Sequence, residues 1–368
     1  MRMKNARQIL LPFSWIYGVG VWLRNKCFDW NLLPSEPFPV PVIVVGNITA
    51  GGTGKTPHVE CLIDVLSKRY KVAVLSRGYK RKTKGFVLAD GYASAETLGD
   101  EPYQIFRKFP QVVVAVDADR REGIKKLLEL PAPDRPEVIL LDDAFQHRYV
   151  RPSLSILLTD SSRPYYNDRL LPVGMLRESK SGAKRADMVI VTKIPEGFNS
   201  NDYNNIEKKL KLAPKQELYF TSYDYKGLLP VFPESTQIKK ETLERLAKED
   251  YGFLLVTGIV NPEPLKTYLG QYTTDLKVLA YADHHAFTPD DIKDIKQEFD
   301  QLKSANKLII TTEKDAMRLM DRTDIPDAIK PCIFYQPIEV VFNQDEEESF
   351  KHKIYNHVDK IKRNSSLA

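Results

Sequence analysis

A glycine-rich stretch at residues 49–56, TAGGTGKT, carries the clearest chemical signal in the sequence. It follows an apolar, β-branched run at 42–45 that predicts a short buried strand, and it precedes a predicted helix at 59–68. The order of strand, glycine loop, Lys-Thr and helix is typical of the phosphate-binding loop (P-loop) of nucleotide hydrolases and kinases. The strict pattern has a glycine where this sequence has Thr49, so the match is a variant of that loop.

Each residue type in this loop has a physical role in holding a nucleotide's phosphates. Glycines let successive backbone N–H groups curl around phosphate oxygens, and a helix N-terminus adds partial positive charge. The ammonium of Lys55 neutralises the β- and γ-phosphate oxygens, and the hydroxyl of Thr56 is a ligand for Mg²⁺. We therefore predict nucleotide binding through Thr49, Ala50, Gly51, Gly52, Thr53, Gly54, Lys55 and Thr56.

Two adjacent acids, Asp142 and Asp143, end a short apolar run at 138–141. A carboxylate at the tip of a strand beside the P-loop is where such enzymes hold Mg²⁺, so we predict that both acids bind the metal with Thr56. The sequence leaves open which acid is the direct ligand. Arg120 is a candidate to stabilise charge in the transition state, with a solvated helix start as the alternative.

Short apolar runs alternate with helical stretches along the chain, which is typical of a doubly wound, mainly parallel α/β sheet. The first domain is predicted over 31–153, and a second, smaller α/β domain over 161–331. The expected strands lie at 42–45, 71–75, 112–116, 138–141, 154–159, 188–192, 218–222, 253–257, 278–281 and 308–311.

Composition narrows the class of protein. The chain has 368 residues, of which 42% are hydrophobic and 28% charged, enough for two domains. Its net charge of +5 is mild and dispersed, so a nucleic-acid partner is not expected. Three cysteines without pair or metal spacing indicate a reduced protein, and six histidines without a Cys/His cluster argue against a structural zinc.

The N-terminal segment, residues 1–30, has basic residues on both sides of an uncharged, aromatic-rich run at 8–23. This run is too short for a comfortable membrane span of about 20 residues. Amphipathic aromatic and basic residues suit the plane of a membrane interface, so we expect peripheral attachment here. Packing of the segment against the domain is the alternative.

Several separated motifs together resemble one family, the tetraacyldisaccharide 4'-kinases (lipid A 4'-kinases). Only the P-loop and LDDAFQHR are specific alone; the ordered set, which reaches about residue 342, is specific as a whole. The motifs are VGNITAGGTGKTPHV at 45–59, LSRGYKR at 75–81, GDEP at 99–102, LDDAFQHR at 141–148, LLPVGMLRE at 170–178, DHHAF at 283–287 and TTEKDA at 311–316.

The resemblance implies an activity and a location. ATP, with Mg²⁺, would phosphorylate the 4'-hydroxyl of a tetraacyl glucosamine disaccharide 1-phosphate, a lipid A precursor. The reaction would take place at the cytoplasmic face of the inner membrane of a Gram-negative bacterium, without an obligate protein partner. The resemblance also implies two domains joined by two antiparallel strands, which we assign to 154–160 and 332–342. The tail at 343–368 is expected to be solvated, with a return to the first domain as the alternative.

The resemblance also assigns residue roles. Asp100 would be the base that accepts the proton of the sugar hydroxyl, although on the residues alone a helix-start acid is the simpler interpretation. His284 would orient that carboxylate, and His285 is an alternative for the same role. The residues expected to line the site are Glu101, Gln146, His147, Arg177 and Glu178.

Two other classes of protein remain as alternatives. A P-loop NTPase switch or metallochaperone would share the loop and the acids, and a switch that reads guanine would carry an NKxD motif. Residues 192–193 and 312–315 match that motif only weakly. A non-catalytic membrane scaffold would leave the co-occurrence of GGTGKT and LDD without explanation.

Overall fold

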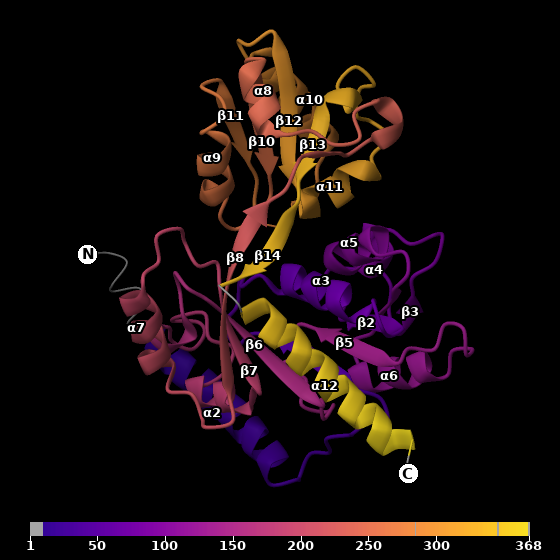
Figure 1. Cartoon of the computed structure of the whole chain (residues 1–368), viewed down its shortest axis with the longest axis vertical. Helices are drawn as coiled ribbons and strands as arrows, with labels where there is room; N and C mark the ends of the chain where they lie inside the picture. Colours follow the sequence, from indigo (N-terminus) through magenta and orange to yellow (C-terminus); the bar gives the residue numbers. More distant parts are fainter. Residues whose placement is uncertain (1–9, 284, 344–345, 367–368) are drawn as a thin grey trace. The chain divides into compact units, whose positions relative to one another are not determined.

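The computed structural model of the chain describes residues 10–283, 285–343 and 346–366. The chain divides into two compact units (Figure 1). The first comprises the chain up to Ala93, then Ile105–Tyr223 and the chain from Val340 onward. The second comprises Ser94–Gln104 and Asp224–Glu339. Each unit is described by itself.

The first unit is built on a sheet of nine strands in the described part of the chain, in the order β14-β8-β7-β6-β1-β5-β2-β4-β3. The strands from β8 to β4 pair in parallel, and β3 pairs antiparallel with β4. The bounds are β1 Val42–Gly46, β2 Val72–Ser76, β3 Val87–Leu88, β4 Val113–Val116, β5 Val138–Asp142, β6 Leu154–Asp160, β7 Met188–Thr192, β8 Glu217–Tyr225 and β14 Ile338–Phe342.

Helices cover both faces of this sheet, which is why its central strands read as continuous apolar runs rather than alternating ones. One face packs against α3 (Lys55–Leu66) and α12 (Glu346–Ser366). The other packs against α6 (Arg120–Leu128) and α7 (Ser200–Leu210). Two short 3-10 helices of this unit are η1 Tyr165–Asn167 and η2 Lys180–Arg185.

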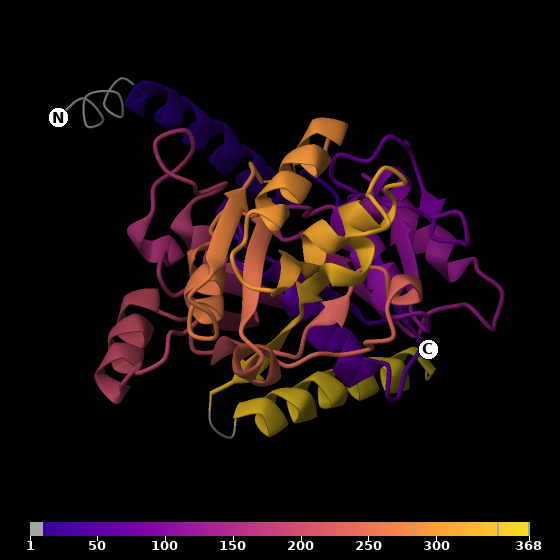
Figure 2. The ribbon, with the colours of Figure 1, turned by 90° about the horizontal axis from the view of Figure 1, so that it is seen from above.

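The helix α2 (Leu11–Asp29) belongs to the first unit (Figure 2). It carries apolar side chains that are exposed. The hydroxyls of Ser14 and Tyr17 donate to Leu170 O at 3.0 Å and Arg177 O at 2.7 Å. The exposed large apolar side chains of α2 are Leu11, Phe13, Trp15, Ile16, Val19, Trp22 and Leu23. Over the described residues, no helix combines the length and apolar character that crossing a membrane requires.

The second unit has its own sheet and core. Among the described residues five strands follow the order β11-β10-β12-β13-β9, around buried side chains such as Phe253 and Phe334. The strands are β9 Leu229–Pro230, β10 Tyr251–Thr257, β11 Leu276–Ala280, β12 Asn306–Thr312 and β13 Ile333–Gln336. The helices are α4 Ala95–Leu98, α8 Leu243–Lys248, α9 Glu263–Leu269, α10 Pro289–Asp300 and α11 Glu313–Met320, with 3-10 helices η3 Pro233–Ser235 and η4 Lys330–Cys332.

The predicted fold class is confirmed: a mainly parallel, doubly wound sheet with a smaller α/β unit. The predicted domain borders need correction. The strand assigned to a linker at 154–160 is β6, which lies between β1 and β7 within the sheet. Its side chains fit that central place, since Ile156 and Leu157 are fully buried. The main segment of the second unit therefore begins at Asp224 rather than at residue 161.

Two further segments depart from the expected borders. The region 332–342 is divided, because β13 belongs to the second sheet and β14 pairs with β8 in the first. Residues 94–104, expected within the first domain, group with the second unit, where the hydroxyl of Tyr103 donates to Asp321 at 3.1 Å. The helix α5 (Asp100–Lys108) starts there and ends in the first unit.

The C-terminal tail is not solvated but forms α12. Phe350, Ile354 and Val358 lie one turn apart along it, at spacings of four residues, and all three are buried in the core of the first unit. This spacing places them on one face of the helix. The alternative, a tail that returns to the first domain, is the arrangement observed.

Candidate active site

The P-loop follows β1, and the acidic pair ends β5 and begins the next turn. Because β1 and β5 are parallel neighbours, their carboxyl ends meet at the same edge of the sheet. Gly51 and Gly54 have φ angles of 115° and 86°, in the left-handed region that favours glycine. The helix α3 begins directly afterwards, at Lys55.

The loop backbone is held by side chains from the next two strands of the sheet. The hydroxyl of Thr192, at the end of β7, donates to Thr53 O at 2.9 Å. Lys193 donates to Gly52 O and forms an ion pair with Asp160, at the end of β6, at 2.8 Å. These contacts fix the direction in which the loop carbonyls point.

The start of the loop pairs with the segment that carries the predicted Arg177 and Glu178. Ala50 N donates to Met175 O at 2.7 Å, and Arg177 N donates to Ile48 O at 2.8 Å. Thr49 forms an isolated bridge with Leu176 and is itself buried. The position at which the strict P-loop pattern has glycine is therefore used here for packing and backbone pairing.

Asp143 lies between two cations. Its Oδ1 is 3.8 Å from Lys55 Nζ and 3.0 Å from Arg177 Nη1, so the predicted residues come together here. Its φ of 47° is in the left-handed region, which Asp tolerates better than most residues. Asp142 precedes it and is fully buried. The site thus has two carboxylates and two cations at the edge of the sheet, next to the hydroxyl-bearing Thr56.

Arg120 is buried rather than solvated, with 3% of its surface exposed. Burial lowers the pKa of its guanidinium to about 10, and Arg77 adds to this effect. The nearby charges of Asp142 and Asp143 oppose it by favouring the charged form. Arg120 is therefore not a solvated residue at a helix start, which was the alternative interpretation. Its positive charge interacts with the carboxylates of Asp142 and Asp143.

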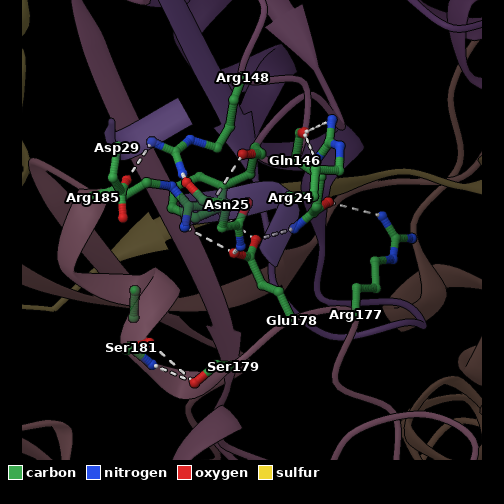
Figure 3. A network of polar contacts seen from close by, with 12 residues as sticks. Arg24, Asn25, Asp29, Gln146, Arg148, Arg177, Glu178, Ser179, Ser181 and Arg185 are labelled. Atoms are coloured by element: carbon green, nitrogen blue, oxygen red, sulfur yellow. Dashed lines mark hydrogen bonds and ion pairs between the residues drawn. The ribbon is translucent and has the colours of Figure 1, made fainter. Parts of the chain in front are cut away.

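A polar network links the segment after residue 170 to α2 (Figure 3). Gln146 Nε2 donates to Asn47 O at 2.7 Å and to Glu178 Oε1 at 3.0 Å. Glu178 also accepts from Asn25 at 3.1 Å and pairs with Arg185 through both carboxylate oxygens, at 2.8 and 2.9 Å. Glu178 is 1% exposed, and its carboxylate is thus neutralised by a bidentate ion pair with Arg185.

His147 lies beside this network, with Nε2 at 3.8 Å from Asp119 Oδ1. Burial, together with the charge of Arg120, lowers the pKa of its imidazole to about 4, so the ring is neutral at pH 7. A neutral imidazole can accept or donate a hydrogen bond without adding positive charge.

Asp100 lies in the second unit, at the start of α5, and forms an ion pair with Arg318. Arg318 also pairs with Asp315 at 2.8 Å, and the buried Asp315 accepts from Gly258 N at 2.9 Å. Although burial by itself lowers the pKa of Arg318, its contacts with Asp100 and Asp315 raise it overall. Glu101 follows Asp100 on the same helix.

Two adjacent histidines, His284 and His285, are candidates for the partner of Asp100. His284 lies outside the described residues. His285 Nε2 is 2.8 Å from Asp291 Oδ2, and its ring stacks on Tyr281. Asp291 also takes part in the capping box that starts α10, so His285 is engaged in local structure.

Sequence reasoning missed several residues that hold the predicted ones in place. Several of their contacts join distant parts of the chain, such as that of Asn25 with Glu178 and that of Arg318 with Asp100, and no local pattern indicates these pairings. Lys193 could have been found, because it follows a predicted strand next to the P-loop and belongs to the weak match at 192–193. The missed residues are Asn25, Asn47, Arg185, Lys193, Asp315 and Arg318.

Comparison with known proteins adds independent findings. The profile of a family described as "Tetraacyldisaccharide-1-P 4'-kinase" matches residues 6–359. A protein of Bacteroides thetaiotaomicron named tetraacyldisaccharide 4'-kinase is 50% identical over 362 residues, covering 98% of this chain and 95% of that protein. One of the same name from Parabacteroides distasonis is 51% identical over 352 residues, covering 96% and 95%.

A solved structure agrees with this result. It is the "apo" form of LpxK from Aquifex aeolicus in complex with ATP, and its TM-score against this chain is 0.73 at 29% identity. The alignment covers 96% of this chain and 99% of the other.

Proposed function

Because this chain belongs to the tetraacyldisaccharide 4'-kinase family, it is an ATP-dependent kinase of lipid A biosynthesis, and we propose how its residues perform the transfer. The γ-phosphate of ATP passes to the 4'-hydroxyl of a tetraacyl glucosamine disaccharide 1-phosphate. One observation carries the residue assignment: the P-loop Lys55 lies 3.8 Å from Asp143 at the carboxyl edge of a parallel sheet. That is the arrangement in which phosphoryl-transfer enzymes hold a triphosphate.

The P-loop amides and Lys55 bind the β- and γ-phosphates of ATP in this proposal. Thr56, Asp142 and Asp143 hold Mg²⁺, and their hydroxyl and carboxylate oxygens are the hard ligands that this ion prefers. When bound, Mg²⁺ supplies charge neutralisation on the phosphate oxygens. Arg120 lies within the field of the same acids and stabilises the charge that develops on the transferred group.

Asp100 accepts the proton of the 4'-hydroxyl as the new P–O bond forms. A carboxylate must be ionised to act as a base, and the ion pair with Arg318 favours the ionised form. The guanidinium is itself fixed by Asp315, so Asp100 is held by an anchored partner. His284, which follows Asp283 in the DHHAF motif, is proposed to orient this base.

The polar network of Gln146, Arg177 and Glu178 lines the place of the sugar acceptor. It is continuous with the P-loop, because Gln146 donates both to Asn47 O and to Glu178. The amide of Gln146 and the guanidinium of Arg177 suit the hydroxyls of a disaccharide, and the buried Glu178 supports them by holding Gln146. His147, neutral at pH 7, completes this lining, and Glu101 is proposed as a site residue beside Asp100 in the second unit.

The acyl chains of the substrate require access from a lipid surface, and α2 supplies a surface of the right character. Trp15 is 75% exposed and Ile16 65%, although an aqueous surface disfavours such side chains. Exposed Trp and aliphatic side chains on a helix suit the membrane interface. The exposed side of α2 therefore supports peripheral attachment to a membrane, and the family resemblance implies that this membrane surface is the cytoplasmic face of the inner membrane.

The assay that tests the proposal follows labelled γ-phosphate. Purified protein is incubated with ATP, Mg²⁺ and the disaccharide 1-phosphate lipid in detergent micelles, and the label is expected on the lipid. ATP hydrolysis that is indifferent to the lipid would indicate a P-loop NTPase switch instead. Lys55→Met is the control, because it removes the phosphate-binding ammonium and should abolish the lipid label.

A further inference from the structure

His58 is a fully buried histidine on α3, immediately behind the P-loop. Its backbone N–H donates to Gly54 O at 3.3 Å, as expected for the first turn of a helix. Its ring approaches the same oxygen, with Nδ1 at 2.7 Å, and Nε2 lies 3.0 Å from Thr221 Oγ1 on β8. The imidazole thus connects Gly54, the residue before α3, to β8. In the sheet β8 is the third strand from β1, after β6 and β7.

The hydrogen-bond partners fix the tautomer of this ring. Gly54 O is a carbonyl oxygen and only accepts, so Nδ1 carries the proton and donates. Nε2 is then the acceptor, and the hydroxyl of Thr221 donates to it. Burial lowers the pKa of the imidazole to about 4, and the charge of Lys193 also lowers it, so the neutral ring persists at pH 7.

The orientation of the Gly54 carbonyl has a direct consequence for the next amide. Gly54 C=O and Lys55 N–H belong to one planar, trans peptide, in which the two groups point in opposite directions. A carbonyl held toward His58 therefore turns the Lys55 N–H away from the ring, toward the N-terminal end of α3, where the glycine loop lies. A peptide flip would instead aim a carbonyl oxygen at a phosphate and repel it.

The neighbouring carbonyls are held in the same manner. Lys193 donates to Gly52 O and Thr192 donates to Thr53 O, so His58 extends a run of three consecutive loop carbonyls that side chains hold. β8 also closes against the loop, since a Cβ on Gly54 would come within 1.8 Å of the hydroxyl of Tyr223.

We propose that His58 is a positioning residue for ATP binding: through its hydrogen bond to Gly54 O it sets the Gly54–Lys55 peptide so that the Lys55 N–H faces the nucleotide's phosphate. The inference rests on nucleotide binding at the P-loop, as in the proposed function. Thr221 acts behind it by holding the ring in the donating tautomer.

A matched pair of variants separates this role from space filling. Asn and Leu have nearly the same shape, but only Asn places an N–H donor where His58 has Nδ1. His58→Leu is expected to raise the Kd for ATP about tenfold, the effect of one well-placed hydrogen bond, while His58→Asn stays within about threefold of the wild type. Thr221→Val is expected to lie between them. Isothermal titration of the purified protein with ATP and Mg²⁺ gives the values.

A structural control comes from the same helix. Ile63→Ala removes a fully buried side chain of α3 and should lower the melting temperature without changing the Kd for ATP. Equal Kd values for His58→Asn and His58→Leu would overturn the inference, and so would a wild-type Kd in both. The titration contains no lipid, so a wild-type protein that binds ATP but fails to phosphorylate the lipid would count against the proposed function alone.

Discussion

At the residue scale, the proposed base Asp100 must stay ionised and yet accept a proton. The ion pair with Arg318 meets the first need, and phosphoryl transfer meets the second because the hydroxyl becomes acidic as its oxygen bonds to phosphorus. Asp100→Asn keeps the shape and removes the basic oxygen. We expect kcat to fall by about 100-fold or more, the usual contribution of a positioned base, while the Kd for ATP stays unchanged. Single-turnover transfer and equilibrium binding measure the two quantities.

The matched variant is Arg318→Lys, which keeps a cation but not the forked contact with Asp100 and Asp315. It should lower kcat less than Asp100→Asn does. A large loss of ATP affinity in Asp100→Asn would show that the carboxylate serves the nucleotide site instead.

Three histidines of the first unit, His58, His147 and His357, have pKa values that burial lowers, and they predict how stability depends on pH. Burial lowers the pKa of His58 and of His147 to about 4, whereas an unfolded histidine titrates near 6.5. Between these values the unfolded chain binds more protons than the folded one, so the free energy of unfolding falls as pH decreases. From pH 7 to 5 the loss should be about 2 kcal/mol for each of His58 and His147.

Urea unfolding at several pH values in this range measures the effect. The His58→Asn variant supplies the comparison, because it should lose the contribution of His58, about 2 kcal/mol between pH 7 and 5. A slope that is the same in wild type and variant would mean that folding does not lower the pKa of His58.

At the element scale, α12 covers one face of the first sheet. Ile354 is fully buried there, next to Phe350 and Val358. Ile354→Ala should lower the free energy of unfolding by about 2–5 kcal/mol, because it removes buried methyl groups and leaves a cavity. Asn356→Ala, at an exposed position of the same helix, is the control and should change it by less than about 0.5 kcal/mol. Thermal and urea unfolding measure both variants.

Local patterns predicted most helices and strands. They also predicted the P-loop and the acidic pair as neighbours at one edge of the sheet. The P-loop and the acidic pair are readable because each depends on neighbours in sequence and on the carboxyl edge of a parallel sheet. Arg185 and Arg318 were not readable, because each one's partner is set by tertiary packing. For α12, the acidic start and basic residues suggested a solvated tail, and the apolar spacing of Phe350, Ile354 and Val358 was overlooked. The domain borders failed at β6 because sequence order does not reveal which sheet a strand joins.

At the scale of the whole molecule, the exposed apolar side of α2 predicts attachment to lipid. Trp15 and Trp22 are 75% and 52% exposed. The double variant Trp15→Gln/Trp22→Gln should weaken binding to vesicles that contain anionic lipid by about tenfold or more, because two large apolar side chains no longer enter the interface. Vesicle sedimentation measures the bound fraction.

Tyr92→Gln is the control, since Tyr92 is 92% exposed but lies outside α2. It should bind vesicles like the wild type. The double variant should still phosphorylate substrate dispersed in detergent. Unchanged sedimentation of the double variant would show that another surface makes the attachment.

The division of the chain also sets the order in which the protein can mature on the ribosome. Strands β1 to β7 emerge early, yet the helix that covers one of their faces is translated only after residues 224–339. During that interval the second unit has all of its segments, while the first still has an open apolar surface. Nascent chains stalled before residue 346 should therefore be strong clients for chaperones, and full-length release should end that dependence.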